Sequence, residues 1–153
     1  MDEGPLSPVA DALARLAESN RDFMRRDPDA YARYWARLGG EGGGFRYAFD
    51  HQTCGRPGCW STWEAMDAAA LSGEDGPILL DCEDDAAALA GAIAVRDGVA
   101  LVGIVPGVRI SHAIAGRFNP AGEIEILDPT MWHEMPGKID YTRPILWRVV
   151  KGA

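Results

Sequence analysis

Basic side chains, cysteines and long apolar runs are all scarce in this chain. Its 153 residues include 15 lysines and arginines against 23 aspartates and glutamates, which gives a net charge of −8. Because no basic stripe is present to follow a phosphate backbone, nucleic acid is not expected as a partner. No apolar run approaches the length that crosses a bilayer, so no membrane partner is expected either.

Cysteine occurs only three times in the chain. A small and odd number of cysteines favours a reducing compartment over a framework of disulfides. The first five residues are acidic and lack the apolar segment of a secretory signal. We therefore expect a cytoplasmic protein.

The first half of the chain is predicted to be mainly helical. Ser7-Pro8 begins a helix with apolar residues at helical spacing, and Asp27-Pro28 separates it from a second helix that ends near Leu38. After a glycine-rich stretch, Ser61-Thr62-Trp63-Glu64 fits a capping box with Ser61 as the N-cap. A third helix is expected to follow.

The second half is predicted to contain one alanine-rich helix, at about 82–96, followed by strands. Alanine allows a helix to pack closely on a sheet. These patterns predict an α+β fold in which N-terminal helices and a central helix pack on an antiparallel sheet. A chain of this length predicts a single domain, 1–153, with an N-terminal helical part, 1–76, and a core, 77–153.

Cys82 is predicted to be the first residue of the central helix, with Asp81 as its N-cap. The unpaired N–H groups and the dipole of a helix N-terminus favour a thiolate and supply a donor for an oxyanion. Four neighbouring carboxylates, at positions 81, 83, 84 and 85, oppose thiolate formation. A reactive cysteine at this position therefore needs a histidine to activate it.

His112 lies in an alternating run that ends at Phe118, and a second such run ends at Asp128. Asn119-Pro120-Ala121-Gly122 joins the two runs like a hairpin turn. If Phe118 pairs with Glu123, His112 faces position 129, next to Asp128. Cysteine, histidine and aspartate would then form a nucleophile, a base and a group that orients the base.

The motifs Asp81-Cys82-Glu83-Asp84, His112-Ala113 and Leu127-Asp128-Pro129-Thr130, in this order and spacing, resemble the core of the transglutaminase-like superfamily, relatives of papain-like cysteine peptidases. The resemblance covers residues 78–132. It implies a transglutaminase-like, papain-like α+β core with Cys82, His112 and Asp128 as a catalytic triad. It further implies activity on an amide or acyl group of a peptide or protein, without a cofactor.

Members of that superfamily include peptidases, amidases, cross-linking transamidases and inactive scaffolds, so two functions are open. One is a cysteine-dependent enzyme that hydrolyses amide bonds, as a thiol protease or amidase, or transfers the acyl group. The other is a catalytically inactive module for interaction or assembly. His133 follows the acid in the sequence and is expected at the rim of the site.

The segment 51–60 carries the remaining candidate residues. His51, Cys54 and Cys59 suggest a zinc site, although the cysteine spacing is loose and a fourth ligand is missing. A disulfide across the turn and two free thiols are the other hypotheses. Relatives place a polar donor ahead of the nucleophile helix, and Gln52 and Trp60 are the candidates for this oxyanion donor.

Overall fold

The structure is a computed structural model that describes residues 6–49, 60–73, 76–107, 111–133 and 135–152. Its elements are, in chain order, α1 (Leu6–Arg26), α2 (Pro28–Leu38), the 3-10 helix η1 (Glu41–Gly43), β1 (Phe45–Tyr47), α4 (Trp63–Leu71), β2 (Ile78–Leu80), α5 (Cys82–Asp97), β3 (Val99–Val105), β4 (His112–Phe118), β5 (Ile124–Leu127), α6 (Pro129–Trp132) and β6 (Leu146–Lys151).

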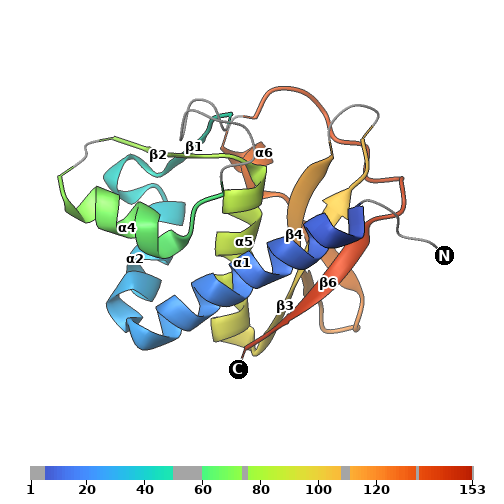
Figure 1. The fold of residues 1–153 in the computed structure, drawn as a ribbon, viewed down its shortest axis with the longest axis horizontal. Coiled ribbons are helices and arrows are strands. Elements are labelled where there is room, and N and C mark those ends of the chain that lie inside the picture. The colour runs from blue at the N-terminus through green and yellow to red at the C-terminus, as the bar shows by residue number, and fades with distance from the viewer. Residues whose placement is uncertain (1–5, 50–59, 74–75, 108–110, 134, 153) are drawn as a thin grey trace.

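Helix α5 stands at the centre of the molecule, between the main sheet and the smaller helices α2 and α4 (Figure 1). The main sheet has four strands in the order β5-β4-β3-β6, and every neighbouring pair is antiparallel. A separate pair, β1 and β2, is parallel. The predicted α+β class with an antiparallel sheet is therefore confirmed.

Small residues allow α5 to be surrounded on all sides. Twelve of its sixteen residues are buried, and half of these are alanine. A Cβ atom added at Gly91 would lie 2.9 Å from Cβ of Asn20 and 3.0 Å from the carbonyl oxygen of Ala17. Helices α1 and α5 therefore pack almost backbone to backbone at this point, and the helix that carries Cys82 is held rigidly.

The helices of the N-terminal half pack directly on the sheet of the C-terminal half. Arg148 of β6 donates hydrogen bonds to Asp11 and Ser7 of α1, at 2.7 and 2.9 Å. Arg21 of α1 donates to the carbonyl oxygen of Lys151, at 2.6 Å. Within the described ranges, no helix combines the length and the apolar character needed to cross a membrane.

Helix α4 begins one residue later than the sequence pattern suggests. Its N-cap is Thr62, whose hydroxyl accepts a hydrogen bond from the Ala65 N–H, and not Ser61. The Ser61 N–H instead donates to the carboxylate of Asp84, at 2.6 Å. The segment before α4 is thereby fixed to the first turn of α5, a long-range contact that no local pattern predicts.

The β4–β5 hairpin is present, but its register differs by one residue from the expected one. Phe118 pairs with Ile124 and not with Glu123. The cause is a five-residue turn in which the Asn119 side chain accepts hydrogen bonds from the N–H groups of Ala121 and Glu123. Extending this register places His112 opposite position 130, not 129.

Candidate active site

The structure brings His112 and Asp128 together in a buried pair. Nε2 of His112 lies 3.0 and 2.9 Å from the two carboxylate oxygens of Asp128. The two side chains are only 8% and 6% exposed. His112 begins β4 and Asp128 follows the last residue of β5, so the pairing of these strands places the two residues at the same end of the sheet.

Asp128 is held by two further hydrogen bonds that the sequence did not reveal. The hydroxyl of Thr130 donates to it at 2.8 Å, and the phenol of Tyr141 donates to its other oxygen. Burial alone would raise the pKa of Asp128, but the hydrogen bonds from His112, Tyr141 and Thr130 outweigh burial and hold the pKa below its ordinary value. Asp128 is therefore ionised at neutral pH.

The ionised Asp128 determines the tautomer of His112. A carboxylate only accepts hydrogen bonds, so Nε2 of the imidazole must carry the proton. Nδ1 then keeps its lone pair and is the ring atom that can accept a proton. Asp128 occupies the N-cap position of α6, yet its side chain makes no capping hydrogen bond, because its oxygens are used by the three side-chain donors.

Cys82 is the first residue of α5 and lies against β4. The backbone N–H of Ala113, the residue after His112, is near enough to the sulfur to act on the pKa of the thiol. Cys82 is 8% exposed. Among the described residues, no hydrogen bond joins this sulfur to the His112 ring. The hydrogen bonds that a catalytic base makes are often long in a free enzyme and shorten when substrate binds.

The acidic residues around Cys82 have different roles. Asp81 and Asp84 form a capping box, in which the carboxylate of each accepts a hydrogen bond from the backbone N–H of the other. Glu83 contacts Cys82 itself, because its carboxylate accepts a hydrogen bond from the thiol, with a sulfur–oxygen distance of 3.4 Å. Two of the four acids therefore stabilise the helix start, while Glu83 acts on the Cys82 thiol.

Burial raises the pKa of the Cys82 thiol well above its ordinary value, and the charge of Glu83 raises it further. The Ala113 N–H acts in the opposite direction, and the charge of Asp128 again raises the pKa. The resting site therefore holds a neutral thiol rather than a thiolate. The dipole of α5 does not overcome these effects.

Replacing Glu83 by glutamine should make Cys82 more reactive, because the change removes both a negative charge and an acceptor that prefers the protonated thiol. A fall in the thiol pKa of about one unit would raise the thiolate fraction about tenfold at neutral pH. The measurement is the rate of Cys82 alkylation by iodoacetamide at pH 7. Glu64→Gln, on the exposed start of α4, removes the same charge elsewhere and should leave the rate unchanged. An unchanged rate in Glu83→Gln would contradict this role of Glu83.

A second buried histidine–aspartate pair lies beside the first. Nε2 of His133 is 3.5 Å from the carboxylate of Asp85, and the two side chains are 9% and 1% exposed. This separation is too long for a good hydrogen bond, and neither oxygen of Asp85 has another partner among the described residues. Burial raises the pKa of Asp85 to about 6, although His133 acts to lower it. His133 is thus a buried residue and not a residue of the rim.

The other predicted site residues are placed only in part. His51, Gln52, Cys54 and Cys59 lie outside the described residues, so the zinc, disulfide and free-thiol hypotheses stay predictions, as does an oxyanion role for Gln52. Trp60 is half-buried and packs against the core. In the part of the chain that the structure describes, no group of three His, Cys, Asp or Glu residues is arranged to hold a metal ion.

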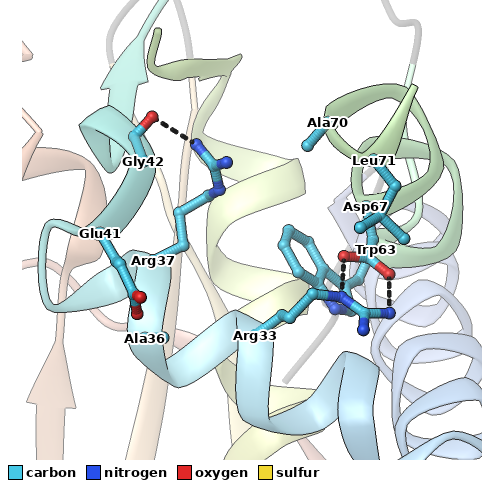
Figure 2. A pocket seen from close by; sticks show the side chains of 9 residues that line it. All are labelled: Arg33, Ala36, Arg37, Glu41, Gly42, Trp63, Asp67, Ala70 and Leu71. Carbon is cyan, nitrogen blue, oxygen red and sulfur yellow. Dashed lines mark hydrogen bonds and ion pairs between the residues drawn. The ribbon is translucent and has the colours of Figure 1, made fainter. Parts of the chain in front are cut away.

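One pocket of the described surface adjoins the candidate triad. It has a volume of about 210 Å³ and lies between His112, the end of β3 and the segment 138–143. Another pocket, of about 230 Å³, lies between α2, η1 and α4 (Figure 2). In that second pocket Arg33 donates two hydrogen bonds to Asp67, and Arg37 donates to the carbonyl oxygen of Gly42. No triad residue lines it, so the pocket beside His112 is the relevant one.

Comparison with known proteins gives no match for this chain among family models, curated proteins or solved structures.

Proposed function

We propose that this protein is a cysteine-dependent enzyme of the transglutaminase-like kind that acts on acyl or amide bonds. The observation that carries the proposal is the buried His112–Asp128 pair, with its Nε2–oxygen distances of 2.9 and 3.0 Å, next to a cysteine that begins a helix. The packing of α5 on β4 supports it, because the thiol then lies beside the strand that carries the histidine, close enough for the Ala113 N–H to act on the thiol pKa.

In this proposal Nδ1 of His112 takes the proton of Cys82 as the sulfur attacks the carbonyl carbon. Asp128 keeps the ring in the required tautomer and stabilises the imidazolium that forms. The backbone N–H of Cys82, at the start of α5, donates to the oxyanion, and Gln52 or Trp60 is the second donor. Water then releases the acyl group, which is hydrolysis, or an amine does, which is transamidation.

The raised pKa of Cys82 shapes this mechanism. A thiol that is neutral at rest cannot form a permanent ion pair with His112, so proton transfer accompanies the attack on the substrate. The substrate would be an amide of a peptide or protein, no cofactor is required, and the cytoplasm remains the proposed location.

The alternative is a catalytically inactive module for interaction or assembly. It is favoured by the hydrogen bond of the thiol to Glu83 and by the raised thiol pKa, since both leave Cys82 poorly nucleophilic. The two proposals differ in whether Cys82 accepts an acyl group and releases it.

The test uses p-nitrophenyl acetate and a chain in which Cys54 and Cys59 are replaced by serine, so that Cys82 is the sole thiol. The enzyme proposal predicts a burst of p-nitrophenol, acetylated Cys82 in the mass spectrum, and continued turnover. Cys82→Ala should show none of these. An absence of acylation, or an acyl group that is never released, would favour the inactive module.

A further inference from the structure

The pocket beside His112 is lined by cationic side chains. Lys138 and Arg143 both line it, although the whole chain has a net charge of −8. The chain has only two lysines, and one of them, Lys138, lines this pocket. A local positive charge in an acidic protein is a condition for selecting an anionic ligand.

Asp140 is the one acid among the described residues that line the pocket, and it does not cancel both cations. The carboxylate of Asp140 accepts hydrogen bonds from the backbone N–H of Thr142, at 2.9 Å, and from the Thr142 hydroxyl. These bonds hold Asp140 in its own turn. The described lining of the pocket, with two cations and this one carboxylate, therefore carries a net positive charge, although Arg143 also acts on Asp140 and Asp128 lies on the far side of the His112 ring nitrogen Nε2.

The segment that carries these residues is anchored to the candidate triad. Tyr141, which lies between Asp140 and Arg143 in the chain, donates its phenol hydrogen bond to Asp128. The pocket wall and the acid that orients His112 are therefore parts of one hydrogen-bonded unit. A group bound in the pocket is placed next to the imidazole that would serve as the base.

We infer that the substrate carries a carboxylate close to the reacting carbonyl, and that Lys138 and Arg143 bind this carboxylate. The substrate class is then an acidic peptide or acyl compound, with an acidic side chain or a free terminal carboxylate. This inference rests on the proposed function, because it assigns a substrate class to the same site. The pocket volume, about 210 Å³, suits a group the size of one side chain.

The test compares two alkylating probes of Cys82 that differ in charge, iodoacetate and iodoacetamide, in the chain without Cys54 and Cys59. The measured quantity is the rate constant with iodoacetate divided by the rate constant with iodoacetamide. Lys138→Gln and Arg143→Gln should each lower this ratio by about twofold to fivefold, the effect of one exposed charge pair, and leave the iodoacetamide rate unchanged. Added salt should lower the ratio in the unsubstituted pocket, because it screens the cations.

Lys151→Gln is the matched control, because it removes the other lysine, on β6, from a position outside the pocket. An equal fall of the ratio in Lys151→Gln would overturn the inference, since the effect would then follow net charge. A ratio that is insensitive to Lys138, Arg143 and salt would also overturn it. Failure of the proposed function looks different, because p-nitrophenyl acetate would then neither acylate Cys82 nor be turned over, whatever the ratio does.

Discussion

His112→Gln is expected to lower the rate of Cys82 acylation by about 10²–10⁴-fold, the usual contribution of a positioned general base. With a thiol pKa well above its ordinary value, Cys82 has little thiolate of its own. In the proposed mechanism it therefore depends on the imidazole for proton removal. Glutamine keeps a hydrogen-bond donor for Asp128 but cannot accept the thiol proton. The measurement is the burst rate with p-nitrophenyl acetate between pH 6 and 8.

His133→Gln provides the matched control for that experiment. The side chain of His133 is similarly buried, at 9% exposure against 8% for His112, but it lies against Asp85 and not Asp128. Its substitution should leave the burst rate close to that of the wild type. An equal loss of burst rate in both variants would indicate general damage to the core. An unchanged burst rate in His112→Gln would show that His112 is not the base.

Asp85→Asn is expected to stabilise the protein at neutral pH by up to about 3 kcal/mol, the equivalent of a pKa raised by two units. The Asp85 carboxylate is fully buried and lacks a good hydrogen bond among the described residues. Burial and three charged groups set its charge state. Burial and Asp128 favour the neutral form, whereas His133 and His112 favour the ionised form. An amide of the same shape has no charge to bury.

The pH dependence of this effect follows from the raised pKa. Between the ordinary value of 3.8 and about 6, the folded state binds a proton that the unfolded state has released. The contribution of Asp85 to the free energy of unfolding is therefore largest below pH 3.8 and is lost as the pH rises through 6. Asp128 behaves oppositely, because its pKa is lowered and its contribution is lost as the pH falls below 3.8.

Urea unfolding at pH 4.5 and 7.5 measures this difference. The wild type should lose stability between the two values through Asp85, and Asp85→Asn should not show this loss. Asp97→Asn is the control, because Asp97 is partly exposed, has a lowered pKa, and should give a small effect of opposite sign. A loss of stability in Asp85→Asn at pH 7.5 would instead indicate a buried ion pair with protonated His133.

The elements around the candidate site could be predicted from sequence because their signals are local. The helix that begins at Cys82 follows from an aspartate N-cap and an alanine-rich run, and β3 at 99–105 follows from an apolar run that ends in Pro-Gly. The hairpin register could not be predicted, because Asn119 closes a five-residue turn with its own side chain. The parallel pairing of β1 with β2 joins segments too distant for any periodicity to reveal.

Of the candidate site, only the contact between residues on neighbouring strands could be predicted from the sequence. The contact of His112 with Asp128 tolerates a register error of one residue, since Asp128 lies beyond the end of β5, where the chain turns. Tyr141 lies in a turn and His133 directly follows α6. No periodic pattern of the sequence therefore links Tyr141 to Asp128, or His133 to Asp85. Their positions depend on packing of the whole chain, which sequence spacing does not encode.

In the proposed enzyme, the phenol of Tyr141 would connect two tasks that enzymes often keep apart, choice of substrate and speed of reaction, because it joins the turn of the pocket to Asp128. Attempts to change specificity by redesigning the turn around Tyr141 will also disturb the acid that orients His112. Substitutions in that turn and at Asp128 should therefore be strongly non-additive in double-mutant cycles. A new specificity would have to be built from the β3 side of the pocket, where no such connection to Asp128 is present among the described residues.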